Sequence, residues 1–239
     1  MAMSDDDDRA ACRDRAFFGR RKGHRLRPRQ IDLIATLLPR LSLALDRPPP
    51  DQLVKLFPHP LDAVRVEIGF GGGENLIAEA TAHRKIGFIG CEPFVNGMAK
   101  ILASIEAGAF DNIRLCAGDA IDLLAWLPEA SIAQIDLLYP DPWPKRRHWK
   151  RRFVQDRTIA MLARVLRPGG VFRFATDIPD YAAWTLERFM RVPDFAWAAE
   201  RADDWRNPWA GFGGTRYEAK AKREGRAPCY LEFVRKAYP

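Results

Sequence analysis

Segments typical of β-strands alternate with segments typical of α-helices beyond residue 60, and this alternation limits the folds that the chain can adopt. The strand-like runs cover residues 64–68, 86–91, 113–117, 135–139, 171–176 and 230–234. Helical periodicity covers residues 73–82, 94–107, 152–166 and 180–190. Such alternation is typical of βαβ units, so we predict an α/β fold with a doubly wound, mostly parallel sheet. Right-handed crossovers then place the loops that follow the strands along one edge, where ligands bind.

The chain before this pattern has a different composition. Residues 1–27 are polar and charged and lack periodicity, so we predict a flexible N-terminal segment. Apolar residues then recur at helical spacing over residues 28–45, and Asp46 with the prolines at 48–50 ends this predicted helix. We predict one domain over residues 28–239, which begins with this amphipathic helix.

The sequence contains no signal for a membrane or for export. No apolar stretch reaches the roughly 20 residues that cross a bilayer, and the N-terminus carries aspartates at positions 5–8 instead of an apolar run. We expect a cytoplasmic protein with no membrane partner. Cysteines stand at positions 12, 91, 116 and 229 without Cys-x-x-Cys spacing, so we predict neither a disulfide framework nor a metal site.

Positive charge is concentrated in two segments. Residues 9–29 contain nine Lys or Arg and one acid, and residues 145–152 contain six Lys or Arg and no acid. Two such segments on a mildly acidic body favour a polyanionic partner over two solvated surface runs. We expect both segments to bind the phosphates of such a partner and to add affinity that falls with salt and carries little sequence information.

A glycine-rich loop follows the first predicted strand. It runs from Glu67 to Glu74 and places glycines at Gly69, Gly71 and Gly73, where the backbone can turn tightly and approach a ligand. A dinucleotide fingerprint that begins at Gly69 would need a glycine at position 74, and Glu74 would repel a pyrophosphate there. S-adenosylmethionine carries an amino group and a sulfonium and no phosphate. Acids beside the loop therefore favour this cofactor over NAD, with a purely structural turn as the alternative.

Acids also follow the next two predicted strands. Glu92 lies 19 residues after Gly73, which is close to the spacing at which a carboxylate accepts the hydroxyls of a ribose. Asp119, followed by Ala120, ends the third strand, where it can meet the rim of an adenine. Each acid alone is more often a helix cap or loop residue, but acids at successive strand ends favour an adenosyl pocket.

A proline-rich segment follows the fourth predicted strand. It reads Pro-Asp-Pro-Trp-Pro over residues 140–144 and continues into the basic residues 145–152. Three prolines in five residues stiffen the backbone and exclude a helix until about Arg152. An acid, an aromatic ring and a group of cations suit a splayed-out RNA base and its phosphates. The alternative is a stiff loop with Trp143 packed in the core.

Further motifs extend the pattern to the C-terminus. They are Thr176-Asp177 and Thr215-x-Tyr217-Glu218. Together with the glycine loop, the strand-end acids and the proline-tryptophan segment, they resemble the bacterial tRNA (guanine-N7-)-methyltransferase family from about Phe18 to Arg235. The resemblance implies a seven-stranded Rossmann-like sheet of the S-adenosyl-L-methionine methyltransferase type. It also implies methylation of N7 of a guanine in tRNA, in the variable loop.

The resemblance assigns roles to individual residues. Asp141 is the expected catalytic residue. The expected cofactor-binding residues, including the loop glycines, are Glu67, Gly69, Gly71, Gly73, Glu92, Asp119, Ala120 and Asp141. The expected substrate-binding residues are Lys145, Asp177, Thr215, Arg216, Tyr217 and Glu218. The family often has Lys and Phe where this chain has Arg216 and Tyr217, and residues 219–225 replace a shorter Arg-Gly pattern. Asp177 is also a candidate cap for a helix that begins near residue 179.

The chemistry implied for Asp141 is positioning. N7 of guanine presents a lone pair at neutral pH, so the transfer needs no general base, and holding the reacting atoms in line supplies most of the catalysis. A methyltransferase for an exocyclic amine would have a second proline at position 143, where this chain has Trp143. A non-catalytic RNA-binding protein and a dehydrogenase are further alternatives. We infer no obligatory protein partner, and both a monomer and a homodimer agree with the sequence.

Overall fold

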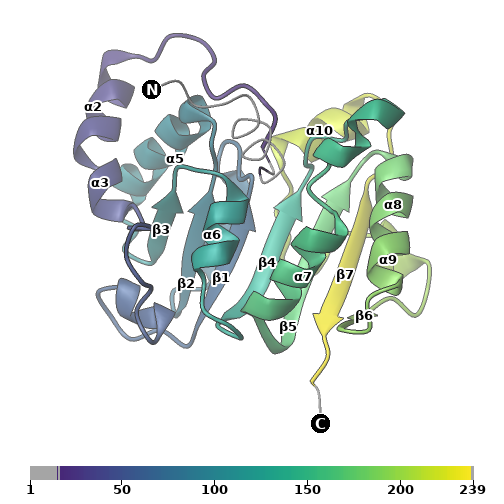
Figure 1. The fold of residues 1–239 in the computed structure, drawn as a ribbon. Coiled ribbons are helices and arrows are strands. Elements are labelled where there is room, and N and C mark those ends of the chain that lie inside the picture. The colour runs from purple at the N-terminus through teal and green to yellow at the C-terminus, as the bar shows by residue number, and fades with distance from the viewer. Residues whose placement is uncertain (1–14, 16, 238–239) are drawn as a thin grey trace, which may run out of the picture.

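A seven-stranded sheet with the order β3-β2-β1-β4-β5-β7-β6 forms the centre of the molecule (Figure 1). The computed structural model describes residue 15 and residues 17–237. Strands β1 to β5 pair in parallel, and β7 pairs antiparallel with β5 and β6. The strands are β1 (Ala63–Ile68), β2 (Ile86–Cys91), β3 (Ile113–Cys116), β4 (Ile132–Leu138), β5 (Leu166–Thr176), β6 (Phe195–Trp197) and β7 (Cys229–Arg235). The predicted doubly wound, mostly parallel α/β sheet is confirmed.

Helices cover both faces of this sheet. Those that follow the parallel strands are α4 (Glu74–Ala82), α5 (Val95–Gly108), α6 (Ala120–Trp126), α7 (Asp156–Val165) and α8 (Pro179–Met190). The remaining helices are α2 (Pro28–Thr36), α3 (Leu38–Leu41), α9 (Asp203–Arg206), α10 (Arg216–Arg223) and the 3₁₀ helices η1 (Leu53–Leu56) and η2 (Arg146–Arg151). In Figure 1, α6 and α7 lie in front of the sheet.

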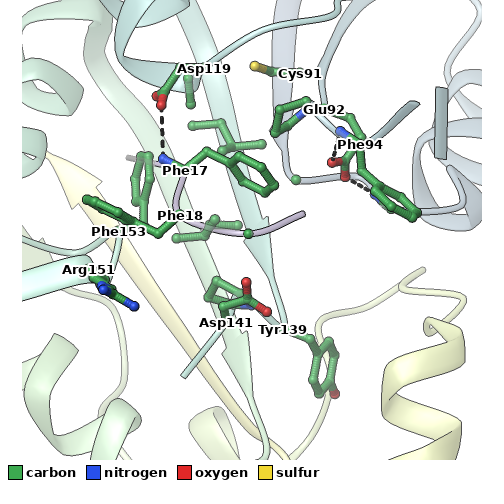
Figure 2. A pocket seen from close by; sticks show the side chains of 18 of the residues that line it. Phe17, Phe18, Cys91, Glu92, Phe94, Asp119, Tyr139, Asp141, Arg151 and Phe153 are labelled. Atoms are coloured by element: carbon green, nitrogen blue, oxygen red, sulfur yellow. Dashed lines mark hydrogen bonds between the residues drawn. The ribbon is translucent and has the colours of Figure 1, made fainter. Parts of the chain in front are cut away.

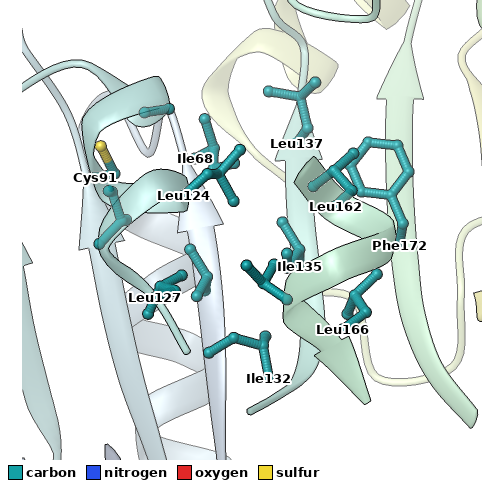
Figure 3. Close-up of a cluster of buried hydrophobic side chains, with 14 of the residues drawn as sticks. Ile68, Cys91, Leu124, Leu127, Ile132, Ile135, Leu137, Leu162, Leu166 and Phe172 are labelled. Carbon is teal, nitrogen blue, oxygen red and sulfur yellow. The ribbon is translucent and has the colours of Figure 1, made fainter. Parts of the chain in front are cut away.

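The alternation of side chains along the strands creates a separate core on each face. Ile68, Ile135, Leu137 and Phe172 point toward α6 and α7 and form the larger core (Figure 3). Burying each such side chain contributes roughly 1.5–3 kcal/mol to the free energy of folding. The second core lies among α2, α4, α5 and the strands β2 and β3, and Leu33 of α2 is buried in it. The leading amphipathic helix therefore packs into the second hydrophobic core of the domain.

Two predicted helices begin or end elsewhere. The leading helix breaks after Thr36, because Pro39 has no N–H to donate to the carbonyl of residue 35. It ends at Leu41 instead of residue 45, because Ser42 forms a β-bridge with Leu115 of the edge strand. The helix predicted over 152–166 begins at Asp156, and the 3₁₀ helix η2 forms before it, where no helix was expected. The three prolines end at residue 144 and do not restrict the backbone that follows.

Three properties of the described residues concern membranes, thiols and metals. Within residues 15 and 17–237, no helix is long and apolar enough to span a bilayer. Cys91, Cys116 and Cys229 are free thiols there, and Cys12 lies outside the described residues. No cluster of His, Cys, Asp and Glu in the same residues could hold a metal ion.

Candidate functional site

A cavity of about 350 Å³ lies at the carboxyl ends of β1, β2, β3 and β4 (Figure 2). This is the edge at which doubly wound sheets bind ligands. Of the predicted cofactor-binding residues, six line the cavity: Gly69, Gly71, Glu92, Asp119, Ala120 and Asp141. The other two, Glu67 and Gly73, are buried and do not line the cavity.

The glycine loop forms the floor of the cavity. Gly69, Gly71 and Gly73 have φ values of 70°, 57° and 80°, in the region that side chains disfavour. Gly73 is the N-cap of α4, and Glu74 follows it and pairs with Lys100 at 3.7 Å. A carboxylate therefore stands at the helix end where a dinucleotide fold would place a pyrophosphate.

Glu92 holds this loop in place. Its Oε2 accepts the Gly71 N–H at 2.7 Å, and its Oε1 accepts the Phe94 N–H at 2.9 Å. Burial raises the pKa of Glu92, and these two hydrogen bonds oppose the rise. A carboxylate has about four acceptor sites, so Glu92 retains acceptors for a ligand.

Glu67 has a supporting position beneath the loop. It is buried and accepts a hydrogen bond from Asn75 Nδ2 at 2.9 Å. Burial raises the pKa of Glu67 well above its usual value. Its side chain therefore braces the start of α4, one layer away from the cavity.

Asp119 connects the cavity to the N-terminal segment. Its Oδ1 caps α6 by accepting the Ile121 N–H, and its Oδ2 accepts the Phe17 N–H, both at 2.9 Å. Phe17 belongs to residues 17–27, here called the N-terminal strap, whose first residues line the cavity (Figure 2). The Arg21 carbonyl accepts the Val95 N–H, and Asn96 bonds to the backbone of residues 23 and 24. Part of the segment predicted to be flexible thus contacts α5 and the site, while residues 1–14 and 16 lie outside the described residues.

The proline-tryptophan segment forms the opposite wall. Asp141 remains exposed at the mouth of the cavity, and partial desolvation raises the pKa of its carboxyl group. Trp143 lines the cavity and meets the ring of Phe18 edge-on, with a centroid distance of 6.5 Å. The Arg151 guanidinium lies over the Trp143 ring at 4.9 Å. Trp143 is not part of the core, so its ring and the neighbouring cations are available to a base and its phosphates.

Comparison with known proteins agrees with this geometry. Residues 62–230 match a family described as a putative methyltransferase. A tRNA (guanine-N(7)-)-methyltransferase of Rhodopseudomonas palustris (strain BisA53) is 65% identical over 93% of this chain and 89% of the relative. One of Nitrobacter hamburgensis is 64% identical over 93% of this chain and 87% of the relative. The chain belongs to the tRNA (guanine-N(7)-)-methyltransferase family.

Membership in this family confirms the predicted enzyme class and S-adenosyl-L-methionine as the methyl donor. Solved structures show the same fold at low identity. The 16S rRNA methyltransferase KamB has a TM-score of 0.57 and 15% identity, over 80% of this chain and 96% of that chain. An rRNA methylase from Streptococcus thermophilus has a TM-score of 0.50 and 11% identity, over 77% and 92%.

The residues of the cavity fit the adenosyl donor that the family implies. Asp119 Oδ2 already accepts an N–H inside the cavity, so an acceptor faces the interior. The space beside Gly69 is open, with no atom within 4 Å of an added Cβ. Carboxylates and a floor of backbone suit a cationic ligand without phosphate.

The predicted substrate-binding residues divide into two groups. Arg216 and Tyr217 line the cavity at the start of α10, and Thr215 caps this helix by accepting the Glu218 N–H at 3.1 Å. Glu218 is buried one turn further along. Two others lie outside the cavity wall: Lys145 is exposed before η2, and Asp177 pairs with Arg226 at 2.5 Å. Asp177 does not cap α8, whose N-cap Ile178 donates its N–H to Thr176 Oγ1.

Arg152 corrects the expectation that all of residues 145–152 contact phosphates. Its side chain is fully buried and lies over the rings of Trp149, Tyr181 and Trp184 at 4.8, 4.9 and 5.1 Å. Its Nε donates to the Pro142 carbonyl at 2.9 Å. Arg152 therefore braces the proline segment from within, and the exposed cations of the run are Lys145, Arg146, Arg147 and Lys150.

The sequence analysis missed several residues of the site. Phe17 and Phe18 are an apolar pair in a basic segment, and that contrast was the available signal. Gly97 on α5 lies so close to the glycine loop that an added Cβ would meet the Gly71 carbonyl oxygen at 2.2 Å. A glycine inside a helix pattern was its only signal.

Proposed function

We propose that this chain transfers a methyl group from S-adenosylmethionine to N7 of a guanine in tRNA, in the variable loop. One observation carries the proposal: a cavity walled by Asp119 and Asp141 opens beside Trp143 and a group of exposed cations. The names of the relatives at 64–65% identity support the same reaction. An adenosyl donor and a stacked base can therefore meet at Asp141.

The cavity residues divide the binding of the donor among them. Glu92 and Asp119 offer acceptors to hydroxyl and amino hydrogens, while the glycine floor admits the ligand close to the backbone. When bound, S-adenosylmethionine supplies an electrophilic methyl group on a sulfonium. Glu67 supports the loop from below.

Asp141 positions the reacting base. The guanine N7 lone pair is free at neutral pH, so no side chain must remove a proton before the transfer. The Asp141 carboxylate accepts hydrogen bonds from the base edge or the donor's amino group, and its charge favours the cationic product ring. Trp143 offers a ring for stacking, and alignment of the reacting atoms at about 3–3.5 Å lowers the barrier.

The exposed cations supply affinity for RNA. The strap carries Arg20, Arg21, Lys22, Arg25 and Arg27, and the run around η2 carries four more, all exposed to solvent. The two groups meet at the cavity, since Phe18 of the strap touches Trp143. Phosphate contacts from both groups would hold the tRNA with its base at Asp141.

The deciding experiment is incubation with labelled S-adenosylmethionine and unmodified tRNA, followed by mass spectrometry of the nucleosides. The expected product is 7-methylguanosine. A methylated exocyclic amine would replace the proposed reaction with the alternative one. Transfer of no label, together with no heat of donor binding in calorimetry, would leave only a non-catalytic RNA-binding protein.

A further inference from the structure

Hydroxyl and carboxylate groups join α10 to β7. The Tyr230 hydroxyl donates to Glu218 Oε1 at 2.8 Å, and both side chains are buried. Lys222, one turn further along α10, pairs with the same carboxylate. These contacts fix the rotation of α10 about its axis.

The rotation of α10 decides where its first turn lies. Arg216 and Tyr217 begin this helix and form one wall of the cavity. They reach over the glycine loop, where a Cβ added to Gly71 would lie 3.3 Å from Arg216 Nη2 and 3.4 Å from the Tyr217 ring. A turn of the helix would therefore move this wall relative to Asp141.

Tyr139 approaches the same contacts from the Asp141 side. Its ring points away from Asp141 and toward α10 (Figure 2), and it packs against the buried cluster that includes Tyr230. Burial raises the pKa of Tyr139, and the adjacent Tyr230 raises it further. The Tyr139 hydroxyl is buried and has no hydrogen-bond partner in the part of the chain that the structure describes.

Packing alone does not explain this hydroxyl. Phe at position 139 would fill the same volume without burying an unpartnered polar atom. The backbone of Tyr139 also has a φ of 51°, which residues other than glycine rarely adopt. This turn directs the ring toward α10 while Asp141, separated from it by the rigid Pro140, faces the cavity.

We propose that Tyr139 and Tyr230 are positioning residues for the methyl transfer. With Glu218 they form a latch between the Asp141 loop and α10, and this latch sets the distance across the cavity between Asp141 and the wall made by Arg216 and Tyr217. Neither hydroxyl touches the reacting atoms. The inference rests on the proposed function, which gives that distance its effect on rate.

The test uses the full-length protein with Tyr139→Phe, Tyr230→Phe and the double variant. We expect kcat for tRNA methylation to fall by up to about ten-fold in each, because each change removes one of the two hydroxyls buried between the Asp141 loop and α10. The double variant should lose little more than either single one, since the groups act as one unit. The KM for S-adenosylmethionine should stay near its wild-type value. Tyr230→Phe should lower the melting temperature, because the buried Glu218 carboxylate loses a donor, whereas Tyr139→Phe removes an unpartnered hydroxyl and should not. Thr185→Val is the matched control: Thr185 lies on α8 outside the latch, its buried hydroxyl has no hydrogen-bond partner among the described residues, and the variant should keep its kcat.

Hydrogen exchange of the α10 amides provides a readout that does not depend on activity. We expect faster exchange over Arg216–Arg223 in both latch variants and not in Thr185→Val. Unchanged exchange and unchanged kcat would overturn the latch. Faster exchange with unchanged kcat would show a structural tie alone and would also overturn the positioning role. Failure of the wild-type enzyme to methylate tRNA would overturn the proposed function. Hydrogen exchange of α10 in the variants would then be the only test of the latch.

Discussion

Asp141 stands between two prolines at the mouth of the cavity, where rigid backbone limits its movement. We expect Asp141→Ala to lower the methylation rate by about 100-fold or more, because loss of alignment alone has effects of this size. Affinity for S-adenosylmethionine should change less, since Glu92 and Asp119 remain.

Single-turnover kinetics and calorimetry measure the two quantities separately. Asp141→Asn is the matched variant, because it keeps the shape and one acceptor and removes the charge. A wild-type rate in Asp141→Ala would remove Asp141 from the mechanism.

Arg152 and Arg147 lie in the same basic run and should behave differently. Arg152→Ala removes a fully buried side chain and its contacts with three rings, so we expect a loss of stability of about 3 kcal/mol. Arg147→Ala, on the surface, should change stability by less than about 0.5 kcal/mol.

Salt dependence of tRNA binding separates the two roles further. Arg147→Ala should reduce the slope of log K against log salt concentration by about 0.7–0.9, the amount for one phosphate contact. Thermal unfolding and filter binding over a salt series measure both effects. Equal unfolding temperatures for Arg152→Ala and wild type would contradict the buried role.

The sequence was a good guide to single residues where the chain order itself places them. Glu92 and Asp119 follow successive parallel strands, so topology alone brings them to one cavity. Arg152 shows the limit of this reasoning. Its enclosing rings come from η2 and α8, and a run of cations does not reveal which member points inward.

At the scale of elements, the N-terminal strap joins two parts of the site. Deleting residues 1–27 removes its cations, so we expect weaker tRNA binding at equal salt, by about ten-fold or more. The deletion leaves the carboxylates and the glycine floor in place, so the donor should still bind.

A second variant separates charge from structure. Changing the five strap cations, Arg20, Arg21, Lys22, Arg25 and Arg27, to Gln keeps Phe17 on Asp119 and removes the positive charge. It should lose RNA affinity to a similar extent and keep the affinity for S-adenosylmethionine. Wild-type affinity for tRNA in both variants would show that the strap does not bind RNA.

The strands and long helices were predictable because hydrophobic periodicity encodes them. The short elements were not. Helix α6 has seven residues, β6 has three, and α10 is so polar that its apolar face is almost absent from the pattern. Tertiary contacts decide these elements: Asp119 caps α6, and Tyr230 anchors α10.

Across the whole molecule, a row of charged residues crosses one face of the sheet. Glu67, Asp136, Arg173 and Glu232 are register partners on β1, β4, β5 and β7. Burial raises the pKa of Asp136 to about 6, so the folded state binds its proton more tightly than the unfolded state does. Above pH 6 the Asp136 carboxylate is ionised in both states, and its burial lowers the free energy of unfolding. As the pH falls through 6, Asp136 is protonated in the folded state first, and the free energy of unfolding rises.

Asp136→Asn removes this effect. We expect a higher melting temperature than wild type at pH 8, from a difference on the order of 3 kcal/mol, and about half that difference at pH 5, where the carboxylate is still ionised in the unfolded state. Circular dichroism melts at both pH values provide the measurement, and Asp122→Asn on the exposed side of α6 is the control. The same temperature shift at both pH values would contradict the role of Asp136.

The bond between the Phe17 amide and Asp119 also has a thermodynamic consequence. One end of the strap touches Asp119, the carboxylate proposed to bind the donor, and the arginines further along the strap are exposed to solvent. Binding of the donor at one end of the strap and binding of RNA at the other would therefore both affect the backbone of residues 17–27. If bound tRNA raises the affinity of the protein for the donor by some factor, thermodynamic linkage requires that the bound donor raise the affinity for tRNA by the same factor.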